Sequence, residues 1–224
     1  MATATMEKPF FLTTIGKKYL MGLTGLVWSG FVLAHMAGNL LMFVSADAYN
    51  SYGHALTSGY LIYFIETLLV LCLVAHVGCA ISLTIENRTA RGHRYAVTPN
   101  GTKGVRLASK TMGIQGSILL AFIILHIATF KYGTFYQTTV GGVGMRDLHR
   151  LLIEVFKSPG YVAWYLVAMV FLFLHLSHGV GSIFQSFGLK NDQNEILIKR
   201  LGWVYGTIVA AGFFAQPIYC FLVG

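Results

Sequence analysis

The stretch SPGYVAWYLVAMVFLFLHLSHGVGSIFQSFGL, residues 158–189, contains no Asp, Glu, Lys or Arg over 32 residues. It decides the fold class because a transmembrane helix needs about 20 consecutive, mostly apolar residues. Four further charge-free runs of 19 to 28 residues lie at 19–46, 67–85, 111–130 and 201–224. A chain in lipid must satisfy its backbone hydrogen bonds internally, and the alternating segments typical of a β-barrel are missing from the sequence. The runs therefore predict an all-α membrane protein with five transmembrane helices.

We expect these helices near 16–44, 60–86, 109–131, 160–187 and 201–222, in a single integral-membrane domain over 1–224. The composition agrees, because 55% of the 224 residues are hydrophobic and only 11% are charged, against about 25% charged in a soluble domain. Short connectors are all that remains, which excludes a soluble catalytic domain. The connector at 132–144, with its Gly141-Gly142 pair, is predicted to be a flexible loop at most.

Lysine and arginine are distributed unevenly between the two sides of the predicted membrane. Twelve fall at the N-terminus and in the second and fourth connectors, and four fall on the opposite side. Because cytoplasmic loops carry the excess of Lys and Arg, we place the N-terminus in the cytoplasm and the C-terminus outside. This topology explains the net charge of +8 better than nucleic-acid binding does.

Four of the eight histidines lie one in each of the first four predicted helices. An imidazole in hydrocarbon is costly and marks a candidate functional site, although any single one can simply bond a neighbouring helix. Counting from the cytoplasmic helix ends places His35 and His126 about 25–28 Å deep, and His76 and His175 about 15–18 Å deep. Two layers of paired imidazoles predict two six-coordinate haems b in a bundle of the first four helices. His178 is the alternative inner ligand.

The three cysteines fall inside predicted spans, and no Cys-x-x-Cys-His motif is present. Covalent attachment of haem is therefore excluded, so the predicted haems are non-covalent.

Seven short segments follow one another along almost the whole chain: GKKYLMGLTG (16–25), HMAGN (35–39), AYN (48–50), NRTAR (87–91), ASKTM (108–112), HLSHG (175–179) and FQSFGL (184–189). As an ordered set they resemble the dihaem cytochrome b membrane-anchor subunits of succinate dehydrogenase and fumarate reductase. The resemblance implies two haems between the first four helices. Its iron ligands carry over to His35, His76, His126 and His175, and it favours His175 over His178.

The resemblance also implies partners and a reaction. A flavoprotein and an iron–sulfur subunit would dock on the cytoplasmic side of a bacterial inner membrane, and the quinone would be menaquinone. The chain would then be the electron-transfer and quinone-reactive subunit of a succinate:quinone oxidoreductase, with no catalytic residue for succinate or fumarate. The direction of electron flow stays open, as does a dimer of such three-subunit complexes.

Quinone chemistry moves protons, so a quinone site needs an acid or base near the ring. Glu66 is the carboxylate well inside a predicted span, near the outer histidine layer, and Asp47 and His54 are candidates to pass protons to it. Unpaired, Glu66 would be protonated or face water; the alternative is a bond to a neighbouring helix. Five polar residues lie at the depth of the inner haem propionates, although ordinary membrane anchoring also explains them: Lys17, Lys18, Arg88, Ser109 and Lys110.

One position departs from some fumarate-reducing members, which carry an acidic group on the fourth helix. Phe173 lies there in this chain, which puts a proton path through that helix in question. Three other interpretations remain: a dihaem anchor for a hydrogenase or formate dehydrogenase, a haem-free small transporter, and a structural anchor without a cofactor. The inward basic face argues against the first, since those partners commonly act outside. The lack of inverted repeats in the sequence argues against the second.

Overall fold

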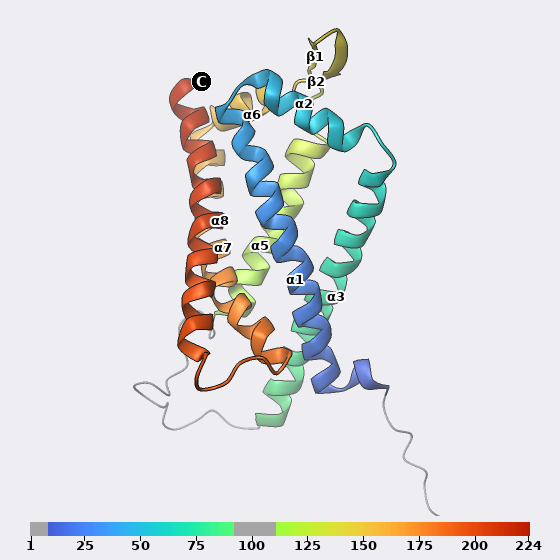
Figure 1. Ribbon diagram of the computed structural model, residues 1–224, viewed down its shortest axis with the longest axis vertical. Helices are drawn as coiled ribbons and strands as arrows, with labels where there is room; N and C mark the ends of the chain where they lie inside the picture. Colours follow the sequence, from blue (N-terminus) through green and yellow to red (C-terminus); the bar gives the residue numbers. More distant parts are fainter. Residues whose placement is uncertain (1–8, 92–110) are drawn as a thin grey trace, which may run out of the picture.

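The computed structural model describes residues 9–91 and 111–224 (Figure 1). Its five long helices are α1 (Thr14–Asn39), α3 (Leu61–Arg91), α5 (Met112–His126, continued by η4, Ile127–Lys131), α7 (Pro159–Ser186) and α8 (Glu195–Val223). Each of the five is long and apolar enough to cross a membrane. The prediction of five helices that are long and apolar enough to span a membrane is confirmed. These helices are typical of a multi-pass membrane protein.

Helices α1 and α7 are at the centre of the packing. Helix α1 contacts α3 and α7, and α7 also contacts α5 and α8. Helix α8 reaches α1 as well, where the Tyr205 hydroxyl donates a hydrogen bond of 2.5 Å to the Ser29 carbonyl. The first four helices alone therefore do not account for the packing, because α8 is an integral part of it.

Two glycines allow α7 and α8 to approach each other closely. A Cβ atom on Gly202 would lie 2.6 Å from the Ser177 carbonyl oxygen, and one on Gly206 would lie 3.1 Å from the Phe173 carbonyl oxygen. Membrane helices lack a hydrophobic drive to associate, so close backbone packing through small residues holds them together.

The substitution Gly202→Leu is expected to destabilise the protein by about 1–3 kcal/mol, because the side chain would overpack this contact. The midpoint of thermal denaturation in detergent measures the effect. Gly78→Leu is the matched control, since a Cβ atom at Gly78 meets nothing within 4 Å. Equal loss in both variants would argue against the tight α7–α8 contact.

Helix α8 begins at Glu195 rather than at the predicted 201. The Glu195 carboxylate pairs with Lys199 at 2.6 Å, one turn on, and with Lys190 at 3.1 Å. These pairs support a charged first turn, which a search for charge-free runs cannot find.

Two other helix ends also differ from the prediction. Helix α3 runs to Arg91 rather than 86, and near its end Glu86 forms an ion pair with Lys17 of α1. Helix α1 is α-helical only to Asn39, and a 3₁₀ stretch, η2 (Leu40–Phe43), completes the predicted segment. The predicted start of the third helix at 109 lies outside the described residues.

The connectors at the end of the molecule near the C-terminus are structured (Figure 1). They form α2 (Ala46–Thr57), α6 (Leu148–Phe156) and a hairpin of β1 (Gln137–Val140) with β2 (Val143–Arg146). The prediction of a flexible loop over 132–144 is wrong. Gly141 and Gly142 have φ angles of +58° and +83° and form the two-residue turn that joins antiparallel strands. The Asn50 amide ties α2 to α6 by donating to the Asp147 carboxylate at 2.9 Å.

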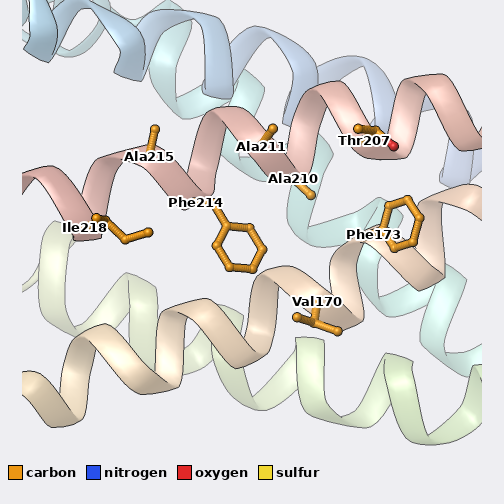
Figure 2. Close-up of a pocket in the computed structure, with 8 residues that line it drawn as sticks. All are labelled: Val170, Phe173, Thr207, Ala210, Ala211, Phe214, Ala215 and Ile218. Atoms are coloured by element: carbon orange, nitrogen blue, oxygen red, sulfur yellow. The ribbon is translucent and has the colours of Figure 1, made fainter.

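An apolar groove runs between α7 and α8 (Figure 2), with a volume of about 620 Å³. Phe214 of α8 points toward α7, and Val170 and Phe173 line the other side. None of the four predicted iron ligands lines this groove. It therefore belongs to the surface that lipid tails would cover in a membrane.

Candidate functional site

The outer pair of predicted ligands lies close together between α1 and α5. His35 is four residues before the end of α1, and His126 is the last residue of α5. Their ring centroids are 5.8 Å apart, with the ring planes at 86°. Phe31 stacks on His35 at 5.3 Å and Phe122 stacks on His126 at 5.6 Å, so aromatic side chains hold both imidazoles.

The inner pair lies between α3 and α7. The ring centroids of His76 and His175 are 6.4 Å apart, with the planes at 63°. These residues lie 15 positions after Leu61 and 16 after Pro159, about 22–24 Å along each helix from its outer end. The structure therefore brings together the pairs that the depth count selected. It pairs His175, rather than His178, with His76.

The spacing within each pair fits a shared metal ion. Two imidazoles that bind one ion at about 2.0–2.1 Å per bond have ring centres roughly 6 Å apart. The two observed separations, 5.8 and 6.4 Å, are close to this value. Among residues 9–91 and 111–224, no group of three or more His, Cys, Asp or Glu side chains could hold a bare metal ion. Pairs suit an ion that receives its remaining four ligands from a porphyrin.

The second ring nitrogens of two histidines have hydroxyl partners. Thr24 Oγ1 donates to the Leu20 carbonyl at 2.8 Å and lies 3.1 Å from His76 Nδ1. Because the hydroxyl proton of Thr24 is directed to the Leu20 carbonyl, its oxygen can accept a hydrogen bond from the Nδ1–H group of His76. That tautomer would leave the Nε2 lone pair of His76 free to bind a metal. The Tyr165 hydroxyl lies 3.1 Å from His126 Nδ1, and its oxygen can accept a hydrogen bond from the Nδ1–H tautomer of that ring. Such partners orient metal-binding imidazoles.

The surroundings of three of the four histidines bear on whether a haem could bind there. His175 Nδ1 is buried and has no hydrogen-bond partner among the described residues. A Cβ atom on Gly25 would lie 3.4 Å from His76 Cε1, so a larger residue there would crowd the ring. At His35, Asn39 Nδ2 donates to the backbone carbonyl at 2.7 Å and borders both ring nitrogens, at 3.3 Å from Nδ1 and 3.4 Å from Nε2, so a bound metal would require Asn39 to shift.

Removing the Tyr165 hydroxyl tests this second set of contacts. Tyr165→Phe is expected to weaken haem binding at the outer pair by about 10-fold, because losing an outer partner of a metal ligand typically costs 10–100-fold. Haem titration of the depleted protein measures the change. Tyr161→Phe is the control, since its hydroxyl bonds Thr129 at 3.4 Å. Unchanged affinity in Tyr165→Phe would contradict the assigned contact.

The predicted quinone residues do not form one cluster. The Glu66 carboxylate forms an ion pair with Lys131, the last residue of η4. Glu66 is therefore not unpaired, and its partner lies on another helix, as in the alternative that the sequence left open. Asp47 is exposed in the first turn of α2, and His54 is half-buried in its last turn.

Three of the predicted propionate residues, Lys17, Lys18 and Arg88, lie where the start of α1 meets the end of α3. Lys17 donates to Ser82 Oγ at 2.8 Å and pairs with Glu86. Lys18 and Arg88 are exposed. Ser109 and Lys110 lie outside the described residues.

The sequence analysis missed the polar partners of the histidines and of Glu66. Tyr165 is ten residues before His175 on the same helix, yet it serves His126 on another helix. Glu86 was passed over because it lies at the predicted end of its span. Its match with Lys17 at the same membrane depth could have indicated the pair.

Comparisons with protein-family models, with curated proteins and with solved structures found no match to this chain. The function of the chain is therefore inferred from its residues and their geometry.

Proposed function

We propose that the chain is the membrane cytochrome b subunit of a succinate:quinone oxidoreductase. In this role it passes electrons between a cytoplasmic iron–sulfur subunit and membrane menaquinone, and it holds two haems b. His35 and His126 would bind the outer haem iron, and His76 and His175 the inner one. The setting would be a bacterial inner membrane, with the N-terminus in the cytoplasm and the C-terminus outside.

The observation that carries the proposal is the pairing of imidazoles across helices at two levels. A single intramembrane histidine is well explained by an interhelical hydrogen bond. Two pairs, each with ring centres near 6 Å, are better explained by one function common to both, which is the binding of a haem iron between the two rings. Low-spin haem irons, when bound, supply one-electron transfer at these two levels.

The chain itself would position the haem-binding imidazoles and tune their interaction with the iron. Thr24 and Tyr165 fix the imidazoles through their second nitrogens, and the aromatic neighbours exclude water from the outer pair. At the cytoplasmic end, Lys18 and Arg88 are exposed and available to a docked subunit or to propionates. Lys17 is engaged by Glu86, so its proposed contact with a propionate would be shared with that carboxylate.

Oxidation of menaquinol to menaquinone releases two electrons and two protons. The electrons leave toward the iron–sulfur partner, and the protons must leave through polar groups. Glu66 lies near the start of α3, where its carboxylate would accept a hydroxyl proton. Asp47 and His54 of α2 would pass protons between Glu66 and external water.

The rival with the same cofactor is an anchor for a hydrogenase or formate dehydrogenase. The rival from another class is a haem-free transporter. The long helices α1, α3, α7 and α8 are each continuous within the described residues, whereas transporters commonly use broken helices.

Purification of the complex through a tag on this chain tests the proposal. We expect a flavoprotein and an iron–sulfur protein to co-purify, and we expect the complex to oxidise menaquinol with fumarate as acceptor. Recovery of hydrogenase or formate dehydrogenase subunits instead would show that the chain is the membrane anchor of one of those enzymes. A haem-free chain without partners would favour the second.

A further inference from the structure

An ion pair joins the outer ends of α3 and α5. Glu66 is five residues after the start of α3, and Lys131 is five residues after His126. The side chains are 34% and 42% exposed. The ion pair is therefore open to the outside of the molecule rather than enclosed in its core.

The backbone that carries Lys131 is unusual. Directly after His126 the helix widens into the π-helical stretch η4 (Ile127–Lys131). Such single π turns are rare and are found frequently at functional sites. A π turn holds an extra residue, so it changes the direction in which Lys131 leaves the helix relative to the register of His126.

Arg146 of the hairpin fixes this end of the helix. Its guanidinium donates to the carbonyls of Lys131 at 3.1 Å, Gly133 at 3.2 Å and Thr134 at 3.0 Å. The last carbonyls of a helix have no partners within the helix. Here Arg146 bonds the carbonyl of Lys131, the last residue of η4, and two carbonyls of the loop that follows. Lys131 is thus held at its backbone by Arg146 and at its ammonium group by Glu66.

We propose that Lys131 is a positioning residue for Glu66, and this inference rests on the quinone role proposed for Glu66 above. The ammonium holds the carboxylate in one position between the outer ends of α3 and α5. A carboxylate oxygen held in one position can accept a hydrogen bond from the hydroxyl of a quinol. Arg146 and η4 supply the rigid base from which Lys131 acts.

The test uses the purified complex with a soluble naphthoquinol as electron donor and fumarate as acceptor. Lys131→Met is expected to lower kcat/KM for the naphthoquinol by about 10-fold or more, and Lys131→Arg to restore it to within about threefold of the wild type. Lys157→Met removes a lysine elsewhere on the outer side and is expected to change nothing. Haem content should stay unchanged in all three variants.

A double-mutant cycle separates positioning of Glu66 from a general structural effect. In the Glu66→Gln background, Lys131→Met is expected to add less than about a twofold loss, because the group that it positions is already gone. Full kcat/KM in Lys131→Met, independent losses in the double variant, or loss of haem in Lys131→Met would each overturn the inference. A wild-type complex without haem or without naphthoquinol oxidation would instead overturn the proposed function itself.

Discussion

Replacing His126 with alanine is expected to reduce the bound haem b from two to one per chain. His126 is one of two imidazoles at the outer level, and its ring centre lies 5.8 Å from that of His35. The remaining imidazole would leave the iron five-coordinate and weakly held. Loss of a group that only hydrogen-bonds to a metal ligand already costs 10–100-fold in affinity or activity. Loss of the ligand itself should therefore lower the rate of quinol oxidation by at least about 100-fold. The pyridine haemochrome assay and steady-state turnover measure both effects.

Two further variants keep this result from being mistaken for misfolding. His126→Met should retain the outer haem, with a higher reduction potential, because a thioether can serve as the sixth ligand. His149→Ala removes a histidine of the outer helix α6 and should retain both haems. If His126→Ala kept two haems and its low-spin optical bands, the outer site would be wrongly assigned.

Under the proposed function, replacing His175 with alanine is expected to remove the inner haem and to uncouple this chain from the proposed iron–sulfur partner. The ring of His175 is 6.4 Å from His76 across the helices. His178 lies three residues on, about 4.5 Å nearer the cytoplasmic end. His178→Ala should therefore retain two haems. Haem content and the rate of haem reduction by the partner subunits measure the difference.

The pair of variants decides between the two candidate ligands on α7. Loss of haem in His178→Ala, with retention in His175→Ala, would transfer the inner site to His178. The His76→Ala variant should match His175→Ala in haem content, because the two rings serve one iron in this account. Different haem contents in these two variants would break the proposed pairing.

Much of the fold was predictable because the membrane imposes a length and an apolar composition on each span. The five helices follow from charge-free runs, but their ends do not. Glu195 begins α8 two turns early through its pairs with Lys190 and Lys199, and such charged turns are invisible to hydropathy. The hairpin was missed although a Gly-Gly pair is a typical two-residue hairpin turn, because the short flanking strands, Gln137–Val140 and Val143–Arg146, do not alternate clearly in the sequence.

The site was predictable in part for a similar reason. The rise per residue in a helix converts sequence position into depth, so the two histidine layers could be read from the chain. The direction in which each side chain points around its helix, and the neighbours that it contacts, could not be predicted from the sequence. Tyr165 serves a histidine on another helix, and Lys131 finds Glu66 only after a π turn changes the helical register.

The haem count of the purified wild-type complex tests the central claim most directly. The account predicts two haems b per chain by pyridine haemochrome analysis, both with the low-spin spectrum of iron held by two imidazoles. A chain that is folded, inserted in the membrane and free of haem would contradict it, and the electron route proposed through this subunit would then have no carrier.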